Sequence, residues 1–224
     1  MQIQSDSGYS GSFLSYPDIW HAWGNSQTIA LAELTQTSSD STLLIGANRE
    51  VDQFYPQLLL KDGLNEYQLS NGAHQQFPQI AYGSRCLAVG ALTCSLVSCD
   101  SSAARLAGLL ASWLLGNNAA GLPMYDPATG RGYDGLLSDS SINQNAGAES
   151  TIEALQTLLE IEQSPLAVRF LSAKPVSKSV PITLAKGGEG KYRIYKLKNG
   201  ERWVLVYSNS LRNFKLLPEQ LWQK

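Results

Sequence analysis

IAYGSRCLAVGALTCSLVSCDSSAARLAGLLASWLL, residues 80–115, determines the fold class expected for this chain. Its two apolar runs, at 79–97 and 101–115, are long and periodic enough to predict two helices. Only SCDSS separates them, and such a short link favours an antiparallel pair. Both helices carry apolar residues on more than one face, so each is expected to pack against several neighbours. The stretch predicts a helical hairpin within a larger helical domain.

Three more helices are expected around this hairpin. The first begins at a cap formed by Asn25 or Ser26 and runs to about residue 37. The second begins at Asp40 and carries apolar residues at spacings of three and four through residue 58. Another covers 148–162 and ends before Pro165. Residues 1–24, 61–79 and 116–147 read as irregular connections.

The last sixty residues have a different pattern. Four segments rich in β-branched and aromatic residues predict strands at 167–173, 179–185, 191–198 and 201–208. Asn199-Gly200 lies between the last two and is a strong hairpin signal. We therefore expect two domains: a helical domain over 1–163 and a small β appendage over 164–224.

Composition excludes several classes of protein. The 224 residues carry 17 Lys and Arg against 19 Asp and Glu, a net charge of −2, and show no basic patch suited to nucleic acid. The apolar runs fall short of the roughly 20 residues that a membrane span needs. The N-terminus has no basic start followed by an apolar core, so no signal peptide is predicted. We expect a cytoplasmic protein without nucleic-acid or membrane partners.

Two segments resemble a known family. SWLLGNNAAGLPMY, residues 112–125, resembles the LGNNP-x-G-x-x-Y stretch of family 9 glycoside hydrolases, which are (α/α)6-barrel enzymes of the endoglucanase type. DSSINQNAGAESTIEAL, residues 139–155, is similar to the closing motif of that family. The region around YDPATGRGYDGL and NQNAGAEST also resembles helical domains fused to some bacterial glycosyltransferases.

The resemblance implies a fold and an assembly. The expected fold is mainly α: antiparallel helical hairpins of a partial (α/α)6-type toroid, with the small C-terminal β appendage. A complete barrel has twelve helices, and this sequence predicts about five. The Asp-Ala-Gly-Asp stretch that supplies the base in family 9 and its His-Arg substrate motif are both absent. We therefore expect the chain either to self-associate or to pair with a missing N-terminal polypeptide.

The resemblance also implies catalytic residues. Glycoside cleavage uses two carboxyl groups, about 5 Å apart for retention and roughly 6.5–9.5 Å apart for inversion. The alignment puts Asp139 in the position of the acid of an inverting enzyme. Glu149 is the rival candidate because it lies in the first turn of a helix that faces the irregular stretch. As a structural alternative, Glu149 interacts favourably with the helix dipole.

Aromatic and polar side chains in the predicted loops are candidates for sugar binding, because pyranose rings stack on flat apolar faces. These candidates are Trp20, His21, Trp23, Tyr125, Asp126, Tyr133, Asp134 and Asn143. The alternatives are turn formation for Asp126 and Asp134, loop packing for His21 and helix capping for Asn143. No cofactor is expected, except that Asp126 and Asp134 together offer weak ligands for calcium.

Two classes of function follow. The leading hypothesis is a glycoside-hydrolase-like domain that acts on or binds a β-linked glucan or a related oligosaccharide, and that is incomplete alone. The alternative is a non-catalytic carbohydrate-binding or structural accessory module of a glycan-processing or glycosyltransferase system. A shared fold does not decide between them.

Overall fold

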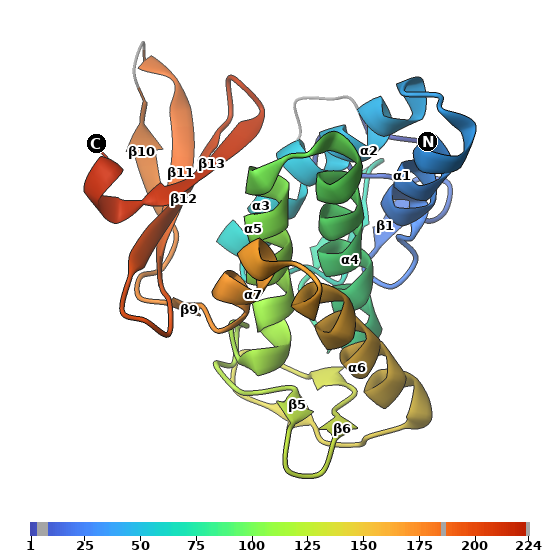
Figure 1. The fold of residues 1–224 in the computed structure, drawn as a ribbon, viewed down its shortest axis with the longest axis vertical. Helices are drawn as coiled ribbons and strands as arrows, with labels where there is room; N and C mark the ends of the chain where they lie inside the picture. The colour runs from blue at the N-terminus through green and yellow to red at the C-terminus, as the bar shows by residue number, and fades with distance from the viewer. Residues whose placement is uncertain (4–8, 185–186, 223–224) are drawn as a thin grey trace.

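The chain forms a bundle of helices with a β-sheet packed along one side (Figure 1). The computed structural model describes residues 1–3, 9–184 and 187–222. Three short segments lie outside it: 4–8 in the predicted N-terminal loop, 185–186 at the end of a predicted strand, and 223–224. Of the described residues, 41% are helical and 22% lie in strands. The mainly α toroid expected from the sequence is therefore wrong, and the fold is mixed α/β.

Helix α4 is central to the bundle and contacts α1, α2, α5 and α6. The expected hairpin between 79–97 and 101–115 is confirmed as α4 and α5. Cys99 turns the chain in the left-handed conformation, and Asp100 caps α5 by accepting a 2.7 Å hydrogen bond from Ser102 N. The helices are α1 (Gln27–Ser38), α2 (Thr42–Gln53), α3 (Tyr55–Leu60), α4 (Ala81–Ser98), α5 (Ser101–Ala111), α6 (Ala148–Glu162) and α7 (Pro165–Leu171), with 3-10 turns η1 (Ser112–Leu115) and η3 (Glu219–Leu221).

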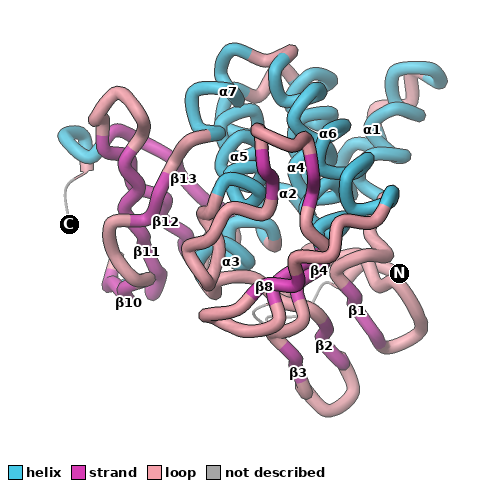
Figure 2. Tube along the Cα trace, turned by 90° about the horizontal axis from the view of Figure 1, so that it is seen from below, coloured by secondary structure: helices cyan, strands magenta, loops and turns pink. Residues whose placement is uncertain are grey.

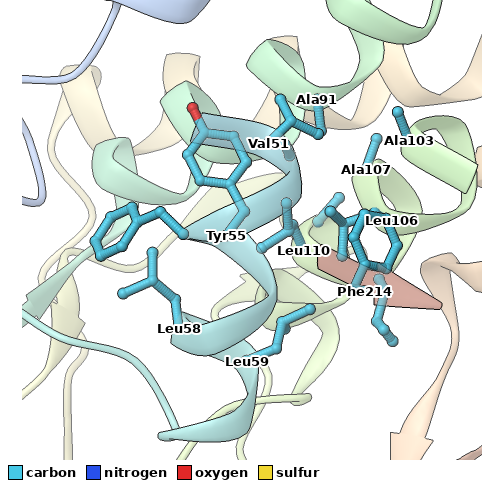
Figure 3. Close-up of a cluster of buried hydrophobic side chains, with 14 of the residues drawn as sticks. Val51, Tyr55, Leu58, Leu59, Ala91, Ala103, Leu106, Ala107, Leu110 and Phe214 are labelled. Atoms are coloured by element: carbon cyan, nitrogen blue, oxygen red, sulfur yellow. The ribbon is translucent and has the colours of Figure 1, made fainter. Parts of the chain in front are cut away.

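The C-terminal sheet is antiparallel, in the order β10-β11-β12-β13, and β9 also pairs with β11. The Asn199-Gly200 hairpin is confirmed between β11 and β12, where Gly200 has φ +88°. Figure 3 shows Phe214 of β13 in one apolar cluster with Leu106 and Leu110 of α5. The sheet thus shares the core of the helices. The strands are β9 (Lys174–Pro175), β10 (Val180–Thr183), β11 (Glu189–Lys196), β12 (Arg202–Ser208) and β13 (Asn213–Pro218).

Two predicted elements are wrong for local reasons. Residues 167–173 form most of α7 instead of a strand, because Ser164 caps a helix whose first residue is Pro165. The predicted helix from Asp40 to 58 is divided at Phe54, and Pro56 lies in the first turn of a new helix, α3. The expected domain boundary after residue 163 would place α7 in the C-terminal appendage. Helix α7 nevertheless packs against α5 of the expected helical domain.

Short strands gather at one end of the helices (Figure 2). Three of them, β4, β7 and β8, form a small antiparallel sheet that joins the regions where α4 and α6 begin. The segments that the sequence predicts to be irregular therefore contain short paired β-strands. These strands are β1 (Ile19–His21), β2 (Glu66–Gln68), β3 (His74–Gln75), β4 (Gln79–Ile80), β5 (Tyr125–Asp126), β6 (Arg131–Gly132), β7 (Gly135–Leu136) and β8 (Ile142–Asn143).

Candidate functional site

A hollow of about 410 Å³ lies where α4 and α6 begin. We call it the α4–α6 hollow. The sheet β4-β7-β8 lines it, together with the first turns of both helices. The polar side chains that line it include those of Tyr82, Asp134, Asn143, Glu149 and Ser150. It therefore contains three of the residues that the sequence put forward as site candidates: Asp134, Asn143 and Glu149.

Close backbone approach builds this hollow. A Cβ on Gly135 would lie 2.2 Å from Gln79 O, so only glycine lets β7 come this close to β4. The adjacent Asp134 connects both helix starts through its main chain. Its carbonyl accepts a 2.9 Å hydrogen bond from Ala81 N, and its N–H donates a 2.8 Å hydrogen bond to Asn145 O. These two backbone hydrogen bonds therefore fix the position of Asp134 independently of its side-chain contacts.

The Asp134 carboxylate is held by two donors. Ser150 Oγ donates to Oδ1 at 2.6 Å, and Asn143 Nδ2 donates to Oδ2 at 3.4 Å. Ser150 is buried, while Asp134 and Asn143 are half-buried. A carboxylate oriented in this way has acceptor capacity left for a ligand hydroxyl, since two oxygens offer about four lone-pair sites.

Tyr82 and Glu149 supply the other polar groups of the hollow. Burial raises the pKa of the Tyr82 phenol above its ordinary value, and the negative charges of Glu149 and Asp134 raise it further. Both carboxylates thus act electrostatically on the same hydroxyl. None of the described residues that line the hollow is Lys or Arg. With two carboxylates and no basic side chain among them, these polar groups do not suit an anion.

An ion-pair network continues from the hollow between α4 and α6. Arg85 of α4 lies 3.5 Å from Glu153 Oε2 through Nε and 3.0 Å from Glu160 Oε1 through Nη2. Burial raises the pKa of Glu153, Arg85 opposes this, and the charges of Glu149 and Glu160 add to the increase. Sequence reasoning missed Tyr82, Arg85 and Ser150, since no motif marks them and only the α4–α6 packing brings them to the site.

Asp139, the first choice for a catalytic acid, lies outside the α4–α6 hollow. It is exposed in a tight turn where Ser138 N donates to Ser141 O at 3.3 Å. An exposed carboxyl among serines is not desolvated, and desolvation is what a general acid of this type requires. The structure therefore favours Glu149 over Asp139 by location, although Glu149 is itself exposed.

Asp126, Tyr125 and Tyr133 have structural roles. Asp126 accepts from Ala128 N at 2.9 Å and from Thr129 Oγ1 at 2.6 Å, and these bonds, with Thr129 contributing most, lower its pKa. Asp126 is therefore a half-buried turn residue, as the structural alternative predicted. Tyr125 and Tyr133 pack against a small apolar cluster around Met124 and Leu136.

The N-terminal aromatic residues divide into two groups. Trp20 is 1% exposed and meets Phe54 edge-on at 4.9 Å, so it is a core residue and cannot stack on a sugar. His21 and Trp23 contact each other at 4.4 Å between ring centroids, and Trp23 is 42% exposed. Burial lowers the pKa of His21, and Glu66, with Oε2 4.0 Å from His21 Nε2, opposes this.

The segment that carries His21 and Trp23 lies against the first turn of α4. The carbonyl of Ala22, between them, would lie 3.0 Å from a Cβ placed on Gly83. Gly83 follows Tyr82, which lines the α4–α6 hollow. Trp23, with its ring partly exposed, remains a candidate for an aromatic platform, although it is not among the residues that line the hollow.

The predicted calcium pair has no support from the geometry. Asp134 lines the α4–α6 hollow, whereas Asp126 lies outside this lining and accepts hydrogen bonds within its own turn. Among the residues that the structure describes, no three His, Cys, Asp or Glu side chains are grouped so as to hold a metal ion.

No protein-family model matches the chain, and no curated protein is similar to it. Within the described ranges, no helix has the length and apolar character needed to cross a membrane.

Proposed function

We propose that the α4–α6 hollow binds an oligosaccharide, with Asp134, Glu149 and Tyr82 as hydrogen-bonding partners of its hydroxyl groups. The observation that carries the proposal is the Asp134 carboxylate, fixed by Ser150 and Asn143 at the wall of a hollow that Glu149 and Tyr82 also line. Carboxylates and phenols that are oriented by the protein are suited to hydroxyl recognition, because little side-chain freedom is lost on binding.

The resemblance of residues 112–125 and 139–155 to family 9 glycoside hydrolases favours a β-linked glucan as the ligand. Binding is the better-supported role. Glu149 is exposed, whereas a general acid needs a carboxyl group that its surroundings keep protonated. The proposal is thus a glycoside-hydrolase-like domain that binds a β-linked oligosaccharide.

Calorimetric titration with cello-oligosaccharides of increasing length tests the proposal. Asp134→Asn and Glu149→Gln should each weaken binding about tenfold, since hydrogen bonds to charged groups contribute roughly 1.5–3 kcal/mol. Asp139→Asn is the matched control, because it removes an exposed carboxylate outside the hollow. Absence of binding to these sugars and to a broad glycan panel would refute the proposal, as would equal losses from the control.

Hydrolysis at the same site is the second candidate. It is favoured by the presence of two carboxylates, Asp134 and Glu149, in one hollow, because glycoside cleavage uses such a pair. Release of reducing ends from β-glucans would establish it. In that case Glu149→Gln should remove most of the activity while Asp139→Asn retains it.

A further inference from the structure

A second, smaller cavity of about 70 Å³ lies among α3, α4, α5, η1 and β11. Its walls are mainly apolar and include Leu58, Leu64, Ile80, Leu87, Leu110 and Trp113. Figure 3 shows Leu58 and Leu110, from α3 and α5, in the adjoining core. The cavity shares Gln79 and Ile80 with the α4–α6 hollow but otherwise has its own lining.

Ser84 provides an unpaired polar group in this lining. It is 9% exposed, and its buried Oγ has no hydrogen-bond partner. A serine within a helix usually donates to the carbonyl four residues earlier, and Ser84 does not. Because a buried hydroxyl without a partner is costly, its presence on the wall of a cavity indicates a ligand that supplies the partner.

Most of the other polar groups of the wall are already engaged, although Arg193 Nε, like Ser84 Oγ, is buried without a hydrogen-bond partner. Gln79 donates from Nε2 to Asp62 O at 2.8 Å and accepts from Trp113 Nε1 at 3.1 Å. Arg193 donates from Nη1 to Asp62 Oδ1 at 2.6 Å and to Leu59 O at 2.7 Å. The charge of Arg193 is thus balanced by Asp62, and the cavity is not an anion site.

We propose that this cavity binds a small aliphatic alcohol, or the hydroxyl-bearing aliphatic end of a larger molecule, with its hydroxyl paired to Ser84 Oγ. A cavity of ~150 Å³ accommodates the six non-hydrogen atoms of benzene, so about half that volume suits a group of roughly three or four non-hydrogen atoms. The apolar walls bind the hydrocarbon part, and one hydrogen bond joins Ser84 Oγ to the ligand hydroxyl, with either oxygen able to act as the donor. The site is distinct from the proposed sugar site, although the two share Gln79 and Ile80.

Titration of methyl-labelled protein with 2-propanol, followed by NMR, tests this inference. Saturable shifts are expected at the methyl groups of Leu64, Ile80, Leu87 and Leu110. Ser84→Ala should weaken 2-propanol binding roughly fivefold, as loss of one hydrogen bond implies. Xenon, which needs no hydrogen bond, should give the same shifts in wild type and Ser84→Ala. Ser102→Ala is the control, since Ser102 lies on α5 outside the cavity.

Leu87→Trp gives a second variant that fills the cavity instead of removing the hydroxyl. It should abolish the saturable shifts from both 2-propanol and xenon, and its dispersed methyl spectrum would show that it is folded. The inference is overturned if 2-propanol produces only non-saturating shifts spread over the surface. It is also overturned if Ser84→Ala binds the alcohol as wild type does, or if the filled variant still binds either probe.

Discussion

Ser150 of α6 donates a 2.6 Å hydrogen bond to Asp134, and the carbonyl of Asp134 accepts from Ala81 N, in the first turn of α4. One residue thus joins the starts of two helices that are distant in sequence. Its side chain is presented to the α4–α6 hollow at the same point. The Asp134–Ser150 pair therefore links the stability of the α4–α6 junction to the ligand binding that we propose for the hollow.

Ser150→Ala should lower the free energy of unfolding by about 1–2 kcal/mol. The substitution removes a buried donor to a carboxylate, and the carboxylate keeps only the longer bond from Asn143. Urea denaturation measures the change, and the same variant should bind cello-oligosaccharides more weakly because Asp134 is no longer fixed. Ser140→Ala, in the exposed turn beside Asp139, is the control and should match wild type in both measurements.

Glu50 should make stability depend on pH. It is fully buried, and burial raises its pKa to about 7 although Thr28, Phe13 N and Tyr55 donate to it. The folded state therefore holds this proton more tightly than the unfolded state. The stabilisation is complete below the ordinary pKa of about 4.5 and is lost as pH rises through about 7. The loss amounts to about 3 kcal/mol, measurable by urea denaturation at a series of pH values.

Glu50→Gln should flatten this dependence, whereas Glu33→Gln, on the exposed side of α1, should leave it intact. A smaller slope should remain, because burial and the charge of Asp100 raise the pKa of Asp52 to about 6. Adding Asp52→Asn should remove that remainder. An unchanged slope in Glu50→Gln would mean that Glu50 is not the group that titrates.

Local signals predicted three of the helices closely. The predicted spans 79–97, 101–115 and 148–162 correspond to α4, α5 with η1, and α6 to within about two residues. The N-cap of α2 is Ser41 rather than the predicted Asp40, although Asp40, one residue earlier, accepts a 3.0 Å hydrogen bond from Thr42 N. The bounds of these helices depend on residues that are close in sequence, so hydrophobic periodicity and the residues at the helix ends are sufficient to predict them.

Non-local pairing could not be predicted in the same way. The strands of β4-β7-β8 are two residues long, and β4 and β7 are far apart in the chain, so no periodicity marks them. The α4–α6 hollow depends on this pairing, which is why Tyr82 was missed. Trp20 was misassigned because a tryptophan in a loop-like sequence gives no sign that it enters the core. The apolar residues that the sequence places on more than one face of 101–115 pack against α4, α7 and β13.

Asp62→Asn should destabilise the contact between the helices and the sheet. The Arg193 side chain is 4% exposed and forms a two-point pair with Asp62, at 2.6 and 3.0 Å. Loss of the carboxylate leaves a buried guanidinium without its counter-charge. Because Asp62 is 45% exposed and solvent screens it, we expect a loss of about 2 kcal/mol in urea denaturation. Glu219→Gln, which breaks the solvent-exposed pair with Arg202, should leave stability unchanged.

The outer face of α6 should mediate self-association. Ile152 and Leu159 lie two turns apart on this face and are 50% and 59% exposed, while Ala154, Thr157 and Ile161 face the core. Light scattering should give a mass above the 24.4 kDa of one chain at high concentration. The double variant Ile152→Lys, Leu159→Lys should be monomeric, and Leu211→Lys, at an exposed turn, should behave as wild type. A wild-type monomer at every concentration would contradict this expectation.

Gly108→Ala should be among the most damaging small substitutions in the chain. A Cβ at this position of α5 would lie 1.9 Å from the carbonyl oxygen of Ala167 in α7. The obstacle is backbone, so relief requires α7 to move away from α5 and to open the core around Phe170, which is fully buried. The gain in helix propensity, about 1 kcal/mol, is smaller than this cost. We expect a net loss of about 3 kcal/mol in urea denaturation.

Gly46→Ala separates this steric effect from the general effect of replacing a helical glycine. Gly46 lies in α2, and its nearest neighbour would be the ring tip of Phe13 at 3.2 Å, a side-chain atom that can shift. The gain in helix propensity should then offset the crowding, and stability should stay within about 1 kcal/mol of wild type. Similar stabilities for the two variants would show that α5 and α7 do not approach each other as closely as the backbone contact at Gly108 requires.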